Sequence, residues 1–251
     1  MSKSIVCALM IGRKGSIGFP GKNIYPVLGR PLATYPLLAA RNSQHVERIY
    51  VSTDSPEIMM ITKEHDAELI ERPPQLATKQ ALGEDVFAHG YHEIKRMLAK
   101  EGLDIELMVL LFANAATLNS DLIDMGVDIL RRNETFDSAV TTSVYNMWSP
   151  LRARKLGEDG CLRPMVPFES FGDPRTLNCD RDSQGDVHFA DMSISVVRPE
   201  CLERMEQGLL PQKWMGRRIA PIPNWGGCDV DYEWQVPMVE FWLRNHGFQE
   251  A

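Results

Sequence analysis

The residues best suited to chemistry lie in one glycine-rich stretch near the N-terminus, from Gly12 to Asn23. It holds four glycines and three cationic side chains in twelve residues. Glycines let backbone N–H groups approach an anion closely, and Arg13 and Lys22 add positive charge without offering an acceptor. The composition predicts a phosphate cradle, with a plain surface turn as the alternative. It is not a Walker loop, because Asn23 stands where Ser or Thr is needed.

A second candidate is a pair of carboxylates near the C-terminus, Asp229 and Asp231, separated by Val230. In an extended segment, alternate residues point to the same side. Two hard oxygen donors beside a phosphate cradle predict a Mg²⁺ site in which phosphate and water oxygens fill the other positions. The alternative is that Asp231 merely caps the helix that follows.

The elements that must position these groups follow the rhythm of βαβ units, which predicts a mostly parallel α/β sheet. Strands are expected at 4–11, 49–52, 67–71, 107–112, 138–144, 193–197 and 217–222, and helices at 31–42, 56–65, 83–100, 121–132, 199–207 and from 236 to 246. The cradle then follows the first strand, at the edge of the sheet where open α/β folds bind ligands. We expect one domain over 1–251, in which the Pro-, Gly-, Arg- and Asp-rich stretch 145–190 forms an arm.

Composition excludes several classes of protein. With 27 Lys+Arg against 34 Asp+Glu, the net charge of −7 argues against a broad basic surface for nucleic acid. The apolar runs stop short of the roughly 20 residues that a bilayer span needs, and no signal peptide is recognised. Five scattered cysteines without a C-x-x-C pair suggest neither a disulfide framework nor a zinc knuckle. We expect a cytoplasmic protein with no nucleic-acid or membrane partner.

Three motifs resemble one known family. The loop reads R-x-x-S-x-G-x-P-x-K-N from Arg13 to Asn23, V-S-T-D follows at 51–54, and R-P-P-Q-L-A at 72–77. In this order and spacing they are similar to the acylneuraminate cytidylyltransferases, the CMP-sialic-acid synthetase family, and the resemblance covers essentially the whole chain. It implies a Rossmann-like nucleotidyltransferase sheet with helices on both faces.

The resemblance also implies an activity, in which CMP from CTP is joined to a 2-keto-3-deoxy sugar acid with release of pyrophosphate, with Mg²⁺ as cofactor. Lys22, Arg13 and Asp231 would act in the reaction, and Asp229 and Asp231 would hold the metal. The implied nucleotide contacts are Gly12, Arg13, Ser16, Lys22, Asn23, Arg72, Ala81 and Gly83.

The acceptor side matches the family least. Arg152 stands where the family has a lysine that reaches the acceptor's carboxylate, and Arg181 matches a family arginine. Phe112 replaces a family glutamine, which leaves the base and the acceptor open, and nearby Asn114 is a polar substitute.

Two other family positions also differ, with Ile17 in place of a lysine and Phe189 in place of a second arginine. In the family, the arm joins two subunits, so a homodimer is implied. A nucleotide-sugar-dependent glycosyltransferase and a non-catalytic nucleotide-binding relative remain the alternatives.

Overall fold

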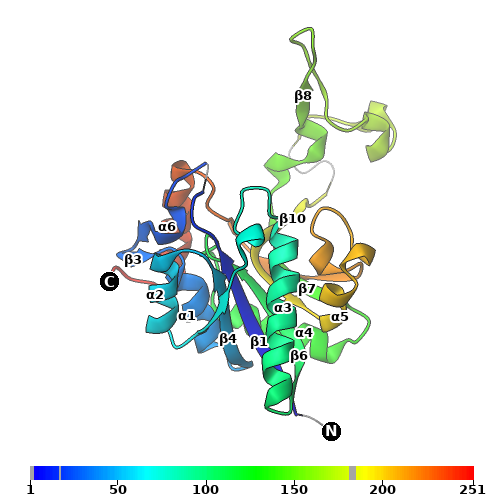
Figure 1. Ribbon diagram of the computed structural model, residues 1–251. Helices are drawn as coiled ribbons and strands as arrows, with labels where there is room; N and C mark the ends of the chain where they lie inside the picture. Colours follow the sequence, from blue (N-terminus) through cyan, green and yellow to red (C-terminus); the bar gives the residue numbers. More distant parts are fainter. Residues whose placement is uncertain (1–2, 17, 181–184) are drawn as a thin grey trace.

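A seven-stranded sheet forms the centre of the computed structural model, which describes residues 3–16, 18–180 and 185–251 (Figure 1). Its strand order is β11-β7-β10-β6-β1-β4-β5. The strands are β1 (Lys3–Gly12), β4 (Val46–Thr53), β5 (Glu68–Glu71), β6 (Leu103–Phe112), β7 (Ser138–Val144), β10 (His188–Val197) and β11 (Ile219–Asn224). Strand β10 runs antiparallel to both neighbours, and the other neighbouring pairs are parallel. The predicted mostly parallel sheet is confirmed.

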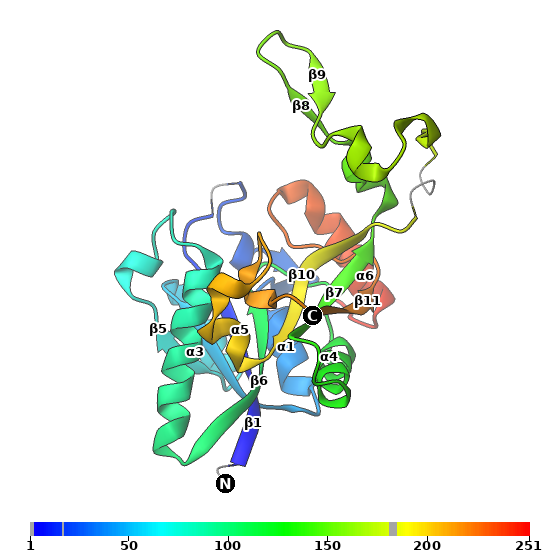
Figure 2. The same cartoon turned by 90° about the vertical axis from the view of Figure 1, so that its right-hand side faces the viewer.

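Helices cover both faces of this sheet, as predicted (Figures 1 and 2). One apolar core holds residues of α1 (Thr34–Asn42), α2 (Pro56–Glu64), α4 (Ser120–Arg132) and α6 (Val236–Asn245), and the other holds residues of α3 (Gly83–Lys100) and α5 (Pro199–Glu203). Strand β1 supplies both cores alternately, with Val6 and Ala8 in the first and Cys7 and Leu9 in the second. Burial on both faces explains why its sequence is a continuous apolar run.

Several predicted elements differ from the structure. The strands expected at 49–52, 107–112 and 217–222 are observed at Val46–Thr53, Leu103–Phe112 and Ile219–Asn224. The helix expected at 31–42 begins only at Thr34, because Pro31 belongs to a small hairpin of β2 (Pro26–Val27) and β3 (Arg30–Pro31). Leu28 and Gly29 close this hairpin with positive φ angles of 45° and 77°, as two-residue turns between strands require. The strand expected at 193–197 begins at His188, and the helix expected at 199–207 ends at Glu203.

Residues from 145 onward leave the body at the carboxyl end of β7 and project away from it before the chain returns in β10 (Figures 1 and 2). This stretch holds a two-stranded ribbon of β8 (Arg154–Leu156) and β9 (Leu162–Pro164), flanked by single 3-10 turns. Leu156 and Leu162 on the ribbon are 71% and 68% exposed. The described residues of this stretch project from the body, while its assignment as a dimerisation arm stays a prediction. In the described part of the chain, no helix is long and apolar enough to cross a membrane.

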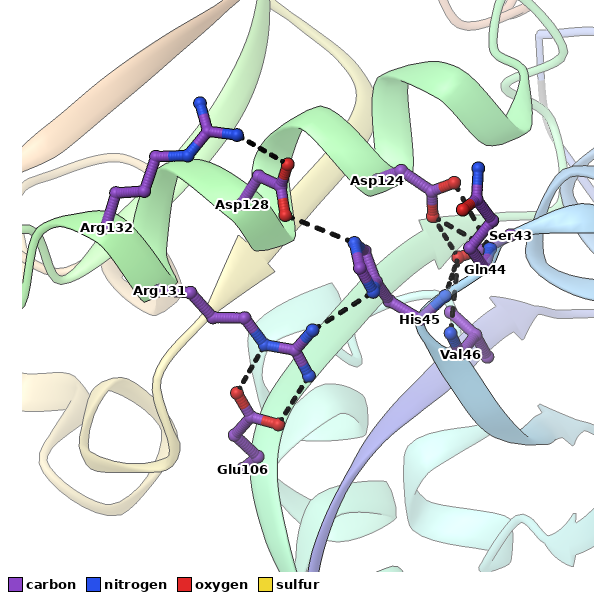
Figure 3. Close-up of polar contacts among 9 residues, drawn as sticks. All are labelled: Ser43, Gln44, His45, Val46, Glu106, Asp124, Asp128, Arg131 and Arg132. Atoms are coloured by element: carbon purple, nitrogen blue, oxygen red, sulfur yellow. Dashed lines mark hydrogen bonds and ion pairs between the residues drawn. The ribbon is translucent and has the colours of Figure 1, made fainter.

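A polar network fastens α4 to the strands beside it (Figure 3). Arg131 donates two hydrogen bonds of 2.7 Å to the carboxylate of Glu106 on β6, and its Nη1 lies 3.0 Å from Nδ1 of His45. The other ring nitrogen of His45 lies 3.2 Å from Asp128 on α4. These contacts join α4 to β6 and to the residue that precedes β4, so they hold three elements in one arrangement.

We expect Glu106→Gln to destabilise the fold in a pH-dependent way. Hydrogen bonding by Arg131 lowers the pKa of Glu106 in the folded state. A lowered pKa adds stability that is present above the unfolded-state pKa and is lost as the pH falls through the folded value. Since both side chains are about one-third exposed, the loss at pH 7 should be about 0.5–1 kcal/mol.

Urea unfolding of wild type and variant between pH 7 and about pH 3 measures this effect. The difference in the free energy of unfolding should shrink towards acid. Glu134→Gln, at an exposed carboxylate near the same helix, should cost less at every pH. A cost of Glu106→Gln that does not change with pH would contradict the prediction.

Candidate functional site

A pocket of about 350 Å³ opens at the carboxyl ends of β1 and β6. Its lining contains every predicted nucleotide contact, together with Asn114 and Asp231 from other parts of the chain. The lining residues are Ile11, Gly12, Arg13, Ser16, Gly18, Lys22, Asn23, Arg72, Leu76, Ala81, Gly83, Val86, Phe112, Asn114 and Asp231. The structure thus brings together residues more than two hundred positions apart, while their roles stay predictions.

The glycine-rich loop is held in place by its own polar groups. Nδ2 of Asn23 donates to the backbone oxygen of Arg13 at 3.2 Å, which draws the two ends of the loop together. The backbone N–H of Lys14 donates to Asp54 at 2.8 Å, so the V-S-T-D motif anchors the loop from β4. Oδ1 of Asn23 is buried without a hydrogen-bond partner among the described groups. A buried acceptor of this kind is costly unless a ligand donates to it, which suits a site that is completed on binding.

Gly12 lies where β1 meets the loop, and no larger residue fits there. A Cβ atom at this position would lie 2.6 Å from Cβ of Ala113 and 3.0 Å from Cδ1 of Ile58. The missing side chain lets the loop leave the sheet close to the neighbouring strand. Its backbone therefore faces the pocket directly.

Arg72 supplies a buried cation to the pocket. Its side chain is 7% exposed and donates to the backbone oxygen and the hydroxyl of Ser52 at the end of β4. Burial, and to a lesser extent the charge of Arg13, lowers the pKa of Arg72 to about 10, while Asp54 opposes the shift. The guanidinium is still charged at neutral pH, and a bound anion would offset the cost of burying it.

The wall opposite the cations is apolar. It consists of Leu76, Val86 and Phe112, and Phe112 packs edge-on against Phe87 with ring centroids 5.1 Å apart. The ring of Trp214 lies 6.1 Å from Phe112. The phenylalanine that replaces the family's glutamine is thus part of an aromatic cluster. This side of the pocket offers an apolar and aromatic surface rather than side-chain hydrogen-bonding groups.

The two motifs meet where Lys22 forms an ion pair with Asp231. The lysine side chain is 12% exposed and that of Asp231 57%. Asp231 does not cap the next helix, because Tyr232 holds the N-cap position of the turn Glu233–Gln235 that leads into α6. The Gln235 side chain accepts from the backbone N–H of Asp231 and Tyr232 at 2.7 and 2.8 Å. Asp231 therefore keeps its carboxylate directed to the cradle.

Asp229 lies on the inner side of the same segment. Asn114 holds this segment in place, since its backbone oxygen accepts from Val230 N at 2.8 Å and its Nδ2 donates to Val230 O at 3.0 Å. The same Nδ2 lies 3.3 Å from a carboxylate oxygen of Asp229. Burial and the neighbouring charge of Asp231 raise the pKa of Asp229, while Lys22 and Asn114 oppose the shift. A nearby positive charge would therefore stabilise the ionised form of Asp229 beside Asp231.

These donors suit a hard divalent cation only in part. Asp229 and Asp231 offer carboxylate oxygens, the ligands that Mg²⁺ prefers. Among residues 3–16, 18–180 and 185–251, no group of three or more His, Cys, Asp and Glu side chains gathers to hold a metal. The pair fits a site in which a bound triphosphate supplies the other oxygens, as Mg²⁺ sites at phosphates commonly do.

Arg152, one of the predicted acceptor cations, does not line this pocket. Arg152 lies on the arm, where it donates to Cys179 O at 2.7 Å and lines a separate hollow of about 620 Å³ with Arg154 and Phe168. Arg181 and Ile17 lie outside the described residues. Of the predicted acceptor contacts that the structure describes, Asn114 lines the pocket and Arg152 does not.

Sequence reasoning missed the anchoring role of Asp54 and the apolar wall of Leu76 and Val86. It also missed a buried polar cluster beneath Asp229, in which Asp191 is 5% exposed. An acidic residue inside an otherwise apolar strand was the available signal for Asp191, but its partners become evident only in the folded chain.

The chain has the α/β fold of several solved structures. A CMP:2-keto-3-deoxy-manno-octonic acid synthetase in complex with CTP superposes with a TM-score of 0.66 over 97% of this chain and 100% of that one, at 13% identity. A 4-diphosphocytidyl-2C-methyl-D-erythritol synthase from Anaerococcus prevotii gives a TM-score of 0.60, covering 96% of each chain at 11% identity. At such identities, these likenesses show the fold.

Residues 7–101 match the family described as cytidylyltransferase. A protein of Helicobacter pylori named pseudaminic acid cytidylyltransferase and UDP-2,4-diacetamido-2,4,6-trideoxy-beta-L-altropyranose hydrolase is 27% identical over 67% of this chain and 31% of its own length. The N-acylneuraminate cytidylyltransferase A of Danio rerio is 24% identical over 92% and 49%. The likeness to the cytidylyltransferase family therefore rests on residues 7–101 and on relatives of 24–27% identity over longer stretches. The chain spans less than half the length of these two relatives.

Proposed function

We propose that this protein transfers CMP from CTP to a 2-keto-3-deoxy sugar acid of the sialic-acid type and releases pyrophosphate, with Mg²⁺ as cofactor. The observation that carries the proposal is the meeting of Lys22 and Asp231 in one pocket with Arg13 and Arg72. This pocket offers cations to phosphates and, beside them, the carboxylate of Asp231 to a metal, while Asp229 lies outside its lining. The match of residues 7–101 to the cytidylyltransferase family and the names of the relatives support the same reaction.

In the proposed reaction, a hydroxyl of the acceptor attacks the α-phosphorus in line, a new P–O bond forms, and the bond to pyrophosphate breaks. Arg13 and Lys22 hold the departing pyrophosphate, and Asn23 fixes the loop that carries them. Asp229 and Asp231 hold Mg²⁺, which would neutralise phosphate charge and orient the reacting oxygens. The apolar wall of Phe112 excludes water and stacks on the base or sugar.

The arm supplies the second half of the proposal. Arg152 and Arg181 lie in the stretch 145–190, and Arg152 is in a hollow separate from the nucleotide pocket. We propose that the arm joins two copies in a homodimer and brings these arginines to the acceptor's carboxylate in the other copy. The exposed Leu156 and Leu162 would then be covered. A cytoplasmic location is part of the same proposal.

The test is pyrophosphate release with Mg²⁺, measured with each of the four nucleoside triphosphates against a panel of 2-keto sugar acids and simple phosphonates. Release with CTP and one acceptor supports the proposal and names the substrate. Release with another triphosphate assigns Phe112 to a changed base pocket. Nucleotide binding without release overturns the proposed activity, and release of a nucleoside diphosphate from a nucleotide sugar assigns a glycosyltransferase.

A further inference from the structure

A buried polar cluster lies directly beneath the segment that carries Asp229 and Asp231. At its centre, the carboxylate of Asp191 on β10 is 5% exposed. One oxygen accepts from the hydroxyl of Thr141 at 2.5 Å and from the backbone N–H of Ser193 at 3.1 Å. The other accepts from the hydroxyl of Ser143 at 2.9 Å and from Nδ2 of Asn224 at 3.1 Å. All four donors are neutral, and among the described residues no cationic side chain pairs with this carboxylate.

Hydrogen bonds connect this cluster to the segment that carries Asp229 and Asp231. The hydroxyl of Ser143 donates to Asp191 and accepts from the backbone N–H of Gly227 at 2.9 Å. The hydroxyl of Thr117 accepts from the backbone N–H of Cys228 at 2.9 Å. Asn224 links these two branches, since its Nδ2 donates both to Asp191 and to the backbone oxygen of Thr117. The two residues immediately before Asp229 are therefore fixed from below.

Close packing adds to these hydrogen bonds. A Cβ atom on Gly227 would lie 2.0 Å from the Oδ2 atom of Asp191 and 2.6 Å from Nδ2 of Asn224. The segment closes over the carboxylate as tightly as a glycine allows. A change in the position of Asp191 must therefore move the backbone that leads into Asp229.

The cluster requires a carboxylate rather than an amide. The amide of Asn224 cannot turn over, because its Oδ1 accepts from the backbone N–H of Trp225 at 2.9 Å and from Nε1 of Trp242 at 3.2 Å. An asparagine at 191 would set its own NH₂ group either against Ser193 N–H or against Nδ2 of Asn224. Neither of these groups can accept a hydrogen bond. In either orientation, the NH₂ group at 191 therefore faces another donor and one hydrogen bond of the cluster is lost.

We infer that Asp191 is a positioning residue which, through Ser143 and Asn224, sets the place of the carboxylate pair and thereby tunes its affinity for a divalent cation. The inference rests on the proposed metal-dependent use of CTP. Groups that orient metal ligands from outside the coordination shell commonly change metal affinity about 10–100-fold when they are removed.

Calorimetric titration of CTP into the folded protein tests this, once with EDTA and once with Mn²⁺ as the probe cation. For wild type, we expect Mn²⁺ to raise the affinity for CTP. In Asp191→Asn, this gain should shrink about tenfold or more, while the affinity in EDTA stays within about twofold. Mutation of a group with only a structural role would lower the affinity for CTP to a similar extent in EDTA and in Mn²⁺.

Asp137→Asn is the matched control. Asp137 also accepts two backbone N–H bonds, from Arg217 at 2.7 Å and Arg218 at 2.9 Å, but it precedes β7 at the opposite end of the sheet. The Asp137→Asn variant should be less stable than wild type and should keep the full increase in CTP affinity that Mn²⁺ produces. If Asp191→Asn does not fold, Ser143→Ala removes the link to Gly227 and should lower the gain in the same direction.

Three outcomes overturn the inference in distinguishable ways. If Mn²⁺ raises the CTP affinity of both Asp191→Asn and Ser143→Ala as much as that of wild type, the inference about Asp191 is wrong. The proposed function is then unaffected. Wild type that binds CTP without any gain from Mn²⁺ removes the metal site on which the inference rests. Wild type that does not bind CTP overturns the proposed function itself.

Discussion

Replacing Asp231 by alanine should lower kcat for pyrophosphate release at least a hundredfold without unfolding the protein. The carboxylate is exposed, makes its ion pair with Lys22, and has no role in capping the next helix. Its loss leaves the proposed metal site with Asp229 alone. Removal of one preorganised charge contact from an active site typically costs about 10²–10³ in rate.

Steady-state pyrophosphate release and thermal unfolding measure this in parallel. Glu233→Ala is the control, because it removes an exposed carboxylate two residues along the chain that does not line the pocket. Both variants should melt close to wild type. Near-normal kcat in Asp231→Ala would contradict the role given to the pair.

Lys22→Ala should have an effect of similar size, expressed in kcat/KM for CTP. The ammonium group is mostly buried, at 12% exposure, and it faces both the cradle and Asp231. Its loss removes a cation from the phosphates and leaves Asp231 without its ion pair. We expect a fall of at least about a hundredfold, and a smaller fall in Lys22→Arg, which keeps the charge.

The control for charge is Lys14→Ala in the same loop. Lys14 is exposed and does not line the nucleotide pocket, so its loss should change kcat/KM by less than about tenfold. Equal losses in Lys14→Ala and Lys22→Ala would show that the general charge of the loop matters and not the placement of Lys22.

The sequence was most informative where a local pattern alone decides the structure. The helix expected at 83–100 and the strand expected at 138–144 have the observed bounds, because strong periodicity and apolar alternation suffice to define them. Pro31 was misassigned because a two-residue turn formed by Leu28 and Gly29 competes with the helix start. The start of β10 was missed because its register shifts between Ala190 and Ser195, around the positive φ of Met192.

For the site, too, the sequence predicted the local motifs but not the contacts that depend on the complete fold. The loop and the carboxylate pair were found as motifs, and the structure places Lys22 against Asp231. The order of the strands brings them together, and the strand order cannot be read from either motif. The partners of Asp191 lie on β7, β10 and β11, so their meeting depends on the complete sheet. Arg152 shows the converse, since a residue matched by its motif lies in a different hollow of the chain.

The antiparallel pairing of β10 with β7 determines how the arm is joined to the body. Val144 pairs with His188 across neighbouring antiparallel strands, so the residues between them form an excursion from one hairpin. The body fixes only the two ends of this excursion, and the free energy of closing a longer or shorter one changes slowly with its length. Insertions, deletions and substitutions in the arm should therefore leave the packing of both cores unchanged. The surface that we propose selects a partner and an acceptor can then vary in length and sequence without a change in the pocket at the ends of β1 and β6.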